Sequence, residues 1–284
     1  MVIRLNFNNK VSVNSLKPLN LNAHSNAIGQ AKLGTPRLTS NMAKRERQQQ
    51  TQPASIDLSH GKIITNQIIK DLNKLVGLDN IKKFVVELYA FVEIQKRRCK
   101  ENLATDPLVL HMIFKGNPGT GKTTVARIFG KLFKELGVLT KGHLIEVERA
   151  DLVGEYIGHT AQRTREQVKK ALGGVLFIDE AYSLARGGEK DFGKEAIDVL
   201  VKAMEDYKNN LILILAGYKD EMDWFMKTNP GLRSRFPLHI DFPDYSVKEL
   251  LEIAQTMAEE REYYFSSDAY IELEKILRKK IFLD

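Results

Sequence analysis

The sequence predicts a three-layer α-β-α fold, in which helices cover both faces of a parallel sheet and a small helical lid follows. Apolar runs at 109–114, 175–178 and 211–216 are typical of strands that are buried on both faces. Segments whose apolar residues repeat with the period of a helix separate these runs, and this alternation favours a parallel sheet. The third observation is a phosphate-binding pattern, Gly-x4-Gly-Lys-Thr at 116–123, which joins the first run to a helical segment.

Composition divides the chain into three parts. Residues 1–58 are expected to form a basic, mostly disordered segment, 59–243 a nucleotide-binding α/β domain, and 244–284 a partial helical lid. Residues 1–52 hold eight Lys or Arg and one acid, Glu46, whereas the other residues hold 35 basic and 35 acidic side chains. The formal charge of +7 therefore belongs to the leading segment, which we interpret as solvated, although such an arm is able to touch nucleic acid or an anionic surface. The neutral body disfavours nucleic acid as a partner.

The overall composition, 43% hydrophobic and 28% charged, is typical of a soluble globular protein. No apolar run approaches the ~18 residues that a membrane span requires, and no signal-peptide core opens the sequence. The only cysteine is Cys99, which excludes an intrachain disulfide and suits a reducing compartment. We therefore expect a cytoplasmic protein without a membrane partner.

The elements follow in order from residue 63, where the first helical pattern begins. A longer helix at 81–98 ends in Lys96-Arg97-Arg98, where cations suit the helix dipole. The lid is predicted to start with a helix whose Ser246 and Glu249 form a capping-box signature. The other predicted helices are 125–136, 160–171, 192–207, 246–262 and 267–280, and the other predicted strands are 143–147 and 238–242.

The residue types of the phosphate-binding loop explain its chemistry. Glycines permit backbone angles that are closed to other residues, so successive N–H groups can point into one anion-binding concavity. Lys122 adds a positive charge at the outer phosphates, and the Thr123 hydroxyl is a candidate Mg²⁺ ligand. The alternative is a glycine-rich turn that fits the pattern by chance, and the strand–loop–helix context argues against it. The residues expected to bind the nucleotide here are Gly116, Asn117, Pro118, Gly119, Thr120, Gly121, Lys122, Thr123 and Thr124.

Two acids, Asp179 and Glu180, directly follow the apolar run at 175–178. The carboxyl ends of parallel strands face the ligand crevice, so both acids are expected beside the phosphates. Asp179 would hold Mg²⁺ through its shell of water, and Glu180 would polarise the water that attacks the terminal phosphate. Solvated strand-end acids are the alternative, which the loop upstream disfavours.

Two further motifs each allow two interpretations. Arg233 and Arg235 are predicted to lie in a turn before the last strand. They are either ordinary surface cations or arginine fingers that reach a neighbouring subunit's nucleotide. Spacing alone does not decide between these interpretations. The triplet Tyr156-Ile157-Gly158 is either a small hydrophobic cap on its own helix or a pore loop that grips an extended polypeptide.

Three runs, GNPGTGKTT, VLFIDEAYSLARGG and NPGLRSRFPLHIDFPDYS, resemble the AAA+ ATPases, a family of P-loop NTPases. Within that family they resemble the group that contains stage V sporulation protein K and the red-type Rubisco activases. The runs GHLIEVERADLVGEYIGHTAQ and GGEKDFGKEAIDVLVKAMED are similar to the sporulation branch. The resemblance covers about residues 74–262.

This resemblance implies roles that the patterns leave open. It makes the loop a Walker A motif and the two acids a Walker B motif. It also implies an ATP-hydrolysing homo-oligomeric ring, expected to be a hexamer, which remodels an unidentified protein client and is related to sporulation. By the same resemblance, Val76 and Gly77 line the adenine pocket, Tyr156 and Ile157 form pore loop 1, and Arg235 is the arginine finger with Arg233 as second candidate.

The sequence departs from the family pattern at two places. The sensor-1 position usually carries Asn or Thr, whereas Ala216-Gly217-Tyr218 stands here, which makes the Tyr218 hydroxyl the candidate. The family also continues with a Gly-Asn-(Ala/Gly)-Arg segment, whereas this sequence stops at Asp284 before it, so we expect an incomplete lid and impaired hydrolysis. The alternative function is therefore a nucleotide-dependent assembly or regulatory scaffold, or a Rubisco-activase-like remodeller, with weak hydrolysis.

Overall fold

A computed structural model of the chain describes residues 61–105, 108–156, 158–187 and 192–281. The expectation that residues 1–58 are mostly disordered lies outside the described residues. Ile157 of the expected pore loop also lies outside them.

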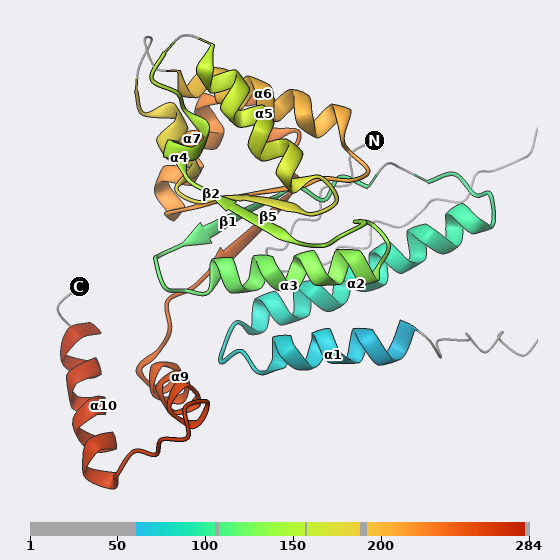
Figure 1. The fold of residues 1–284 in the computed structure, drawn as a ribbon. Helices are drawn as coiled ribbons and strands as arrows, with labels where there is room; N and C mark the ends of the chain where they lie inside the picture. Colours follow the sequence, from blue (N-terminus) through green and yellow to red (C-terminus); the bar gives the residue numbers. More distant parts are fainter. Residues whose placement is uncertain (1–60, 106–107, 157, 188–191, 282–284) are drawn as a thin grey trace, which may run out of the picture. The chain divides into compact units, whose positions relative to one another are not determined.

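A parallel sheet of five strands, in the order β2-β3-β4-β1-β5, is the centre of the fold (Figure 1). Met112, the first residue of β1, pairs with both Ile214 and Leu238, so β1 lies between β4 and β5. Because every neighbouring pair is parallel, the carboxyl ends of all the strands lie at one edge of the sheet. The strands are β1 (Met112–Gly116), β2 (Leu144–Val147), β3 (Val175–Ile178), β4 (Ile212–Gly217) and β5 (Leu238–Phe242).

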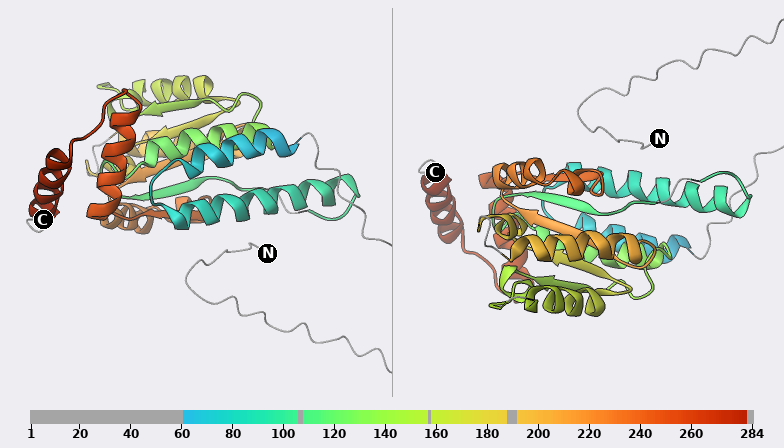
Figure 2. Two further views of the ribbon diagram at one scale, coloured as in Figure 1. Left: turned by 90° about the horizontal axis from the view of Figure 1, so that it is seen from below. Right: turned by 90° about the horizontal axis from the view of Figure 1, so that it is seen from above.

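Helices cover both faces of this sheet, as Figure 1 and the two views of Figure 2 show. One face carries α1 (Gly61–Asn73), α2 (Asp79–Lys100) and α3 (Lys122–Glu135). The opposite face carries α5 (His159–Ala171), α6 (Gly193–Asp206) and α7 (Lys219–Thr228). The predicted three-layer α/β fold is therefore confirmed.

Successive side chains of a strand point to opposite faces of the sheet, so a separate core forms under each helical layer. In β1, Met112 and Phe114 pack with the α1–α3 layer, whereas Ile113 packs with the opposite layer. The Phe114 ring contacts Phe129 of α3 and Phe242 of β5, with centroids 6.0 Å and 4.9 Å apart. When both faces of a strand are buried, the side chains on both faces are apolar, which is why β3, β4 and residues 112–114 of β1 are apolar runs.

The structure differs from the prediction mainly in short elements. β1 begins at Met112 rather than at 109, and His111 contributes its ring to the ladder instead, since its Nδ1 accepts the Leu213 N–H at 3.1 Å. The prediction contains no helix at α7, although Met222, Phe225 and Met226 bury one of its faces. It also lacks α4 (Arg149–Leu152), the 3-10 helix η1 (Ala181–Ala185) and α8 (Pro230–Arg233).

Two helices follow the sheet, α9 (Val247–Glu259) and α10 (Ser267–Ile281), and they contact each other. The predicted capping box opens α9, because Ser246 Oγ accepts the Glu249 N–H at 3.3 Å and Glu249 Oε2 accepts the Ser246 N–H at 2.8 Å. Among the helices in the described ranges, none combines the length and apolarity needed to cross a membrane.

Candidate nucleotide-binding site

The carboxyl edge of the sheet brings together the residues that the sequence singles out. Gly116 ends β1, Asp179 follows β3 and Tyr218 follows β4, and β1, β3 and β4 are neighbours in the sheet. In open parallel sheets, ligands bind in the crevice outside this edge. The fold therefore gathers the predicted phosphate-binding loop and the predicted acids on one side of the molecule.

The loop 116–121 has the backbone that an anion cradle requires. Gly119 and Gly121 have φ angles of 77° and 91°, in the left-handed region that favours glycine. A Cβ on Gly119 would meet no atom within 4 Å, so the space in front of this residue is open. A Cβ on Gly116 would instead lie 2.4 Å from the Phe242 carbonyl oxygen, so β1 and β5 approach closely at this point. The α3 helix starts directly after Gly121, and within the described residues no side chain caps it.

Lys122 is a buried cation that the loop itself holds. Its side chain is 9% exposed, and its Nζ donates to the carbonyl oxygens of Gly116 at 2.9 Å and Asn117 at 2.8 Å. Burial lowers the pKa of the Lys122 ammonium below its ordinary value, while the charges of Asp179 and Asp244 raise it. The ammonium thus lies among loop carbonyls and carboxylates, where a phosphate oxygen is a stronger partner than a neutral carbonyl.

The acids predicted as the Walker B motif lie at the end of β3. Asp179 is half-buried, and its Oδ1 accepts the backbone N–H of Glu180 at 2.9 Å. Glu180 is exposed and has a φ of 47°, a left-handed backbone that is uncommon for a residue with a side chain. Such strain collects at functional sites, and here it accompanies the change of direction from β3 into η1.

Thr123 and Asn117 have partners that the sequence analysis missed. Thr123 Oγ1 donates to Glu146 Oε1 at 3.2 Å, and Glu146 belongs to β2. Asn117 Nδ2 donates to both carboxylate oxygens of Asp244, at 3.0 Å and 2.9 Å. A charge within the short strand LIEV was the one available signal for Glu146, and nothing local in the sequence signals Asp244.

The residues expected at the adenine lie where three distant segments meet. The half-buried Val76 and Gly77 precede Leu78, whose Cδ1 would lie 3.7 Å from a Cβ on Gly121. A Cβ on Gly77 would lie 3.6 Å from the Tyr245 ring and would collide with the Glu249 carboxylate. The start of α9 therefore closes on the 76–78 turn and on the phosphate loop.

Hydrogen bonds fix the α9 side of this junction. The Tyr245 hydroxyl donates to the Thr120 carbonyl oxygen at 3.3 Å, and burial, with the nearby charge of Glu249, raises the Tyr245 pKa. Hydrogen bonds from Ser246 lower the pKa of Glu249. Thr120 itself is 3% exposed, and its Oγ1 donates to the Asn117 carbonyl oxygen at 2.7 Å. Tyr245 and Glu249 are thus further candidate site residues that the sequence analysis missed.

Tyr218, the sensor-1 candidate, lies among aromatic neighbours at the same edge. It is half-buried, and its ring centroid lies 6.1 Å from that of Tyr182. The Arg186 guanidinium lies 4.4 Å from the centroid of the Tyr182 ring. Burial, followed by the charge of Glu180, raises the pKa of Tyr182, so this cluster lies in the field of the predicted catalytic acid.

The two arginines do not join the site of their own chain. Arg235 pairs with Glu205 of α6, and its Nη1 also donates to the Gly231 carbonyl oxygen at 2.9 Å. Arg233 is exposed. Both residues precede β5, whose first residue pairs with the first residue of β1, so they approach the amino ends of the strands and not the carboxyl edge.

Tyr156 and Gly158 of the expected pore loop lie between α4 and α5. Tyr156 is 65% exposed, and its ring makes an edge contact with the ring of His159, with centroids 5.4 Å apart. Gly158 has a φ of 83° and a Cβ there would meet no atom within 4 Å. Because His159 is the first residue of α5, this contact is compatible with the cap interpretation, whereas the exposure of Tyr156 is compatible with the pore-loop interpretation.

The chemistry of the donors fits Mg²⁺ bound together with a nucleotide. Within the described residues, no group of three or more His, Cys, Asp or Glu could hold a metal by itself. Mg²⁺ in such sites takes one or two protein oxygens and completes its shell with phosphates and water. The Thr123 hydroxyl and the Asp179 carboxylate are oxygen donors of this kind.

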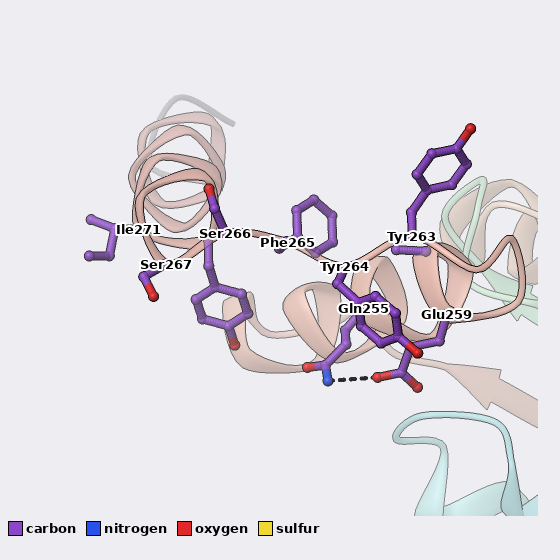
Figure 3. Close-up of a pocket in the computed structure, with 10 residues that line it drawn as sticks. Gln255, Glu259, Tyr263, Tyr264, Phe265, Ser266, Ser267 and Ile271 are labelled. Carbon is purple, nitrogen blue, oxygen red and sulfur yellow. Dashed lines mark hydrogen bonds between the residues drawn. The ribbon is translucent and has the colours of Figure 1, made fainter.

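A pocket of about 390 Å³ lies between α9 and α10, apart from the candidate nucleotide-binding site (Figure 3). Tyr263, Tyr264 and Phe265 line it, and at its rim Gln255 Nε2 donates to Glu259 Oε1 at 2.8 Å. None of the described residues that line this pocket is Lys or Arg, so it lacks a cation for a phosphate.

Comparison with known proteins identifies the family to which the sheet-containing part of the chain is similar. Residues 112–244, which hold all five strands and the loop, match the family described as "ATPase family associated with various cellular activities (AAA)". The chain is 61% identical over 221 residues to Stage V sporulation protein K of Bacillus subtilis (strain 168), covering 78% of this chain and 68% of that protein. It is 51% identical over 207 residues to Protein CfxQ of Xanthobacter flavus, covering 72% of this chain and 65% of that protein. It is also 48% identical over 223 residues to Protein CbbX of Cereibacter sphaeroides, covering 77% and 72% respectively.

Proposed function

Because this chain belongs to the AAA family of ATPases, we propose that it binds ATP with Mg²⁺ at residues 116–124 and uses hydrolysis to remodel a protein client. The observation that carries this proposal is the junction at the carboxyl edge of the sheet. There, the loop has open space at Gly119, the charge of Asp179 acts on the buried Lys122, and Gly121 lies close to Leu78 of the 76–78 turn. A triphosphate, its metal and a purine ring need a cradle, a cation, a hard oxygen donor and an apolar turn, and these residues supply all four.

The roles of the residues follow from their contacts. Lys122 Nζ would exchange the carbonyl oxygens of Gly116 and Asn117 for phosphate oxygens, whose negative charge makes the hydrogen bonds stronger. Thr123 and Asp179 would hold Mg²⁺, which neutralises charge on the phosphates during transfer. Glu180, exposed at the end of β3, would accept the proton of the attacking water. Tyr218 would complete the site through its hydroxyl.

The oligomer and the client complete the proposal. Arg235, with Arg233 as second candidate, would act on the nucleotide of a neighbouring subunit in a homo-oligomeric ring, proposed to be a hexamer. The position of both arginines, away from the carboxyl edge of their own sheet, supports action in trans. Tyr156, Ile157 and Gly158 would grip the client, and the exposure of Tyr156 supports this. We further propose a cytoplasmic location and a role related to sporulation; the name of one relative supports the role.

Two substitutions test binding and turnover separately. The full chain is titrated with ATP and Mg²⁺ by calorimetry, and phosphate release is followed at steady state. We expect Lys122→Ala to abolish the heat of binding, because the buried ammonium is lost. We expect Glu180→Gln to bind ATP as the parent does and to release phosphate at least ~100-fold more slowly, the typical contribution of a general base.

Lys131→Ala is the matched control, because Lys131 is an exposed lysine on the same helix α3. It should bind and hydrolyse ATP like the parent. A Lys122→Ala variant with the parent's heat of binding would contradict the assignment of the loop. A Glu180→Gln variant that turns over as fast as the parent would contradict the role of Glu180. A parent that binds ATP without releasing phosphate would favour the scaffold function.

A further inference from the structure

Glu146 joins the amino-terminal half of α3 to the sheet. Its Oε1 accepts the hydroxyl proton of Thr123 at 3.2 Å, and its Oε2 accepts from Arg127 Nη2 at 3.0 Å. One carboxylate therefore serves two residues of α3, and one of them is the residue whose hydroxyl the proposed function assigns to Mg²⁺.

The position of Glu146 follows from the periods of its two elements. Thr123 and Arg127 are four residues apart on α3 and so lie on one face of the helix. On β2, Leu144 packs with the α1–α3 layer and Ile145 with the opposite layer, so Glu146 points toward the layer that contains α3. The Glu146 carboxylate on β2 therefore faces two hydrogen-bond donors on α3, Thr123 and Arg127.

The Arg127–Glu146 ion pair is expected to add little to the stability of the fold. The Arg127 and Glu146 side chains are 60% and 41% exposed, and exposed ion pairs of this kind contribute little to the free energy of unfolding. The contact that distinguishes Glu146 from an ordinary surface acid is its hydrogen bond with Thr123. This hydroxyl has one proton and two lone pairs.

We propose that Glu146 is a positioning residue for Mg²⁺ binding, which it promotes by accepting the Thr123 hydroxyl proton and so leaving the oxygen lone pairs for the metal. This inference rests on the proposed function, because it requires Thr123 to be a Mg²⁺ ligand. Arg127 has a supporting role, since it holds the second carboxylate oxygen and so limits the rotation of the Glu146 side chain. Partners that orient a ligand in this way typically change metal affinity by about 10-fold or more.

The test separates the metal from the nucleotide. The affinity of the full chain for the non-hydrolysable β,γ-imido analogue of ATP is measured in EDTA and again in Mg²⁺, and the ratio of the two affinities is the gain due to Mg²⁺. We expect Glu146→Ala to lower this gain about 10-fold and to leave the affinity in EDTA unchanged. Glu135→Ala, which removes an exposed acid from the last turn of α3, should keep the parent's gain.

A rescue distinguishes orientation from loss of charge. In Glu146→Gln, Arg127 and Thr123 compete as donors for the single amide oxygen, so the gain due to Mg²⁺ should fall. In the double variant Glu146→Gln with Arg127→Met, that oxygen is available to Thr123 alone, and the gain should recover to within about threefold of the parent. The thermal midpoint of each variant, measured without nucleotide, shows whether the fold is retained.

Each outcome has one meaning. A Glu146→Ala variant with the parent's Mg²⁺ gain overturns the inference, even if its affinity falls equally in EDTA and in Mg²⁺. A double variant that recovers nothing also overturns it, because charge and not orientation would then be the cause. A parent that binds no analogue in either condition overturns the proposed function first, and the inference with it.

Discussion

The imidazole of His111 completes the hydrogen bonding of the central strands. The side chain is 5% exposed, and its Nδ1 accepts the Leu213 N–H, so the proton of the neutral ring must be on Nε2. Burial lowers the pKa of His111 from its ordinary 6.5 to about 4. Protonation would both bury a charge and convert the acceptor of the Leu213 bond into a donor.

This pKa predicts a loss of stability in mild acid. The folded chain binds the His111 proton less tightly than the unfolded chain. Protonation of His111 therefore leaves the free energy of unfolding unchanged above pH 6.5 and lowers it as the pH drops toward 4. The predicted loss between pH 7 and pH 4.5 is about 2–3 kcal/mol of unfolding free energy. Urea unfolding at both pH values measures it, and in His111→Gln the difference between them should shrink by this amount.

His159→Gln is the control, because His159 is an exposed histidine at the start of α5. It should retain the parent's dependence on pH. An unchanged dependence in His111→Gln would show that other groups cause the loss in acid.

Residue roles could be predicted from the sequence where a short pattern carries the chemistry. Lys122 and Asp179 lie where the loop and strand patterns predicted, at one edge of the sheet. Glu146, Asp244 and Tyr245 were not predicted, because their partners Thr123, Asn117 and Thr120 are distant in sequence. A contact between remote residues depends on the fold and leaves no local pattern.

At the scale of elements, two glycines form a matched pair that tests the phosphate loop. Gly119 and Gly158 have φ angles of 77° and 83°, and a Cβ on either would meet no atom within 4 Å. Replacement by alanine should therefore cost each protein about 1–2 kcal/mol of stability, from backbone strain alone. Only Gly119→Ala should also weaken nucleotide binding, because its methyl group would enter the proposed cradle.

Calorimetry with ATP and Mg²⁺, together with thermal unfolding, measures both effects. We expect the affinity of Gly119→Ala to fall at least ~10-fold and that of Gly158→Ala to stay within about twofold of the parent. Equal affinities in the two variants would contradict the assignment of the open space at Gly119 to a phosphate.

Element boundaries were predictable where burial imposes a period. β3 and β5 have the predicted bounds, and α5, α6 and α10 differ by about a residue at their ends. Short elements such as α4, α8 and η1 were not predicted, since four or five residues cannot display a helical period. The α7 helix was not predicted either, although its buried residues Met222, Phe225 and Met226 have the spacing of one helical face.

At the scale of the whole molecule, the arginines predict complementation between subunits. If Arg235 acts on a neighbour's nucleotide, Arg235→Ala and Lys122→Ala proteins should each be inactive, and their mixture should regain phosphate release. In the mixture, some interfaces pair an intact loop with an intact arginine. Loss of such an arginine typically costs 10³-fold or more in turnover, so even partial recovery is measurable.

The ion pair of Arg235 with Glu205 requires a control. Glu205→Gln removes this partner and leaves the guanidinium in place. It should retain activity if Arg235 acts on nucleotide, whereas a loss as large as that of Arg235→Ala would indicate a structural role. A mixture that stays inactive would contradict action in trans.

The order of the strands also has a consequence for synthesis of the chain. The central strand β1 leaves the ribosome early, yet its partners β4 and β5 pair with it at Ile214 and Leu238, more than a hundred residues later. At about 5–20 residues per second, the apolar β1 segment waits roughly 5–25 s for its neighbours. During that interval the exposed apolar segment is prone to aggregate. A chaperone that binds it during translation should therefore raise the yield of folded protein.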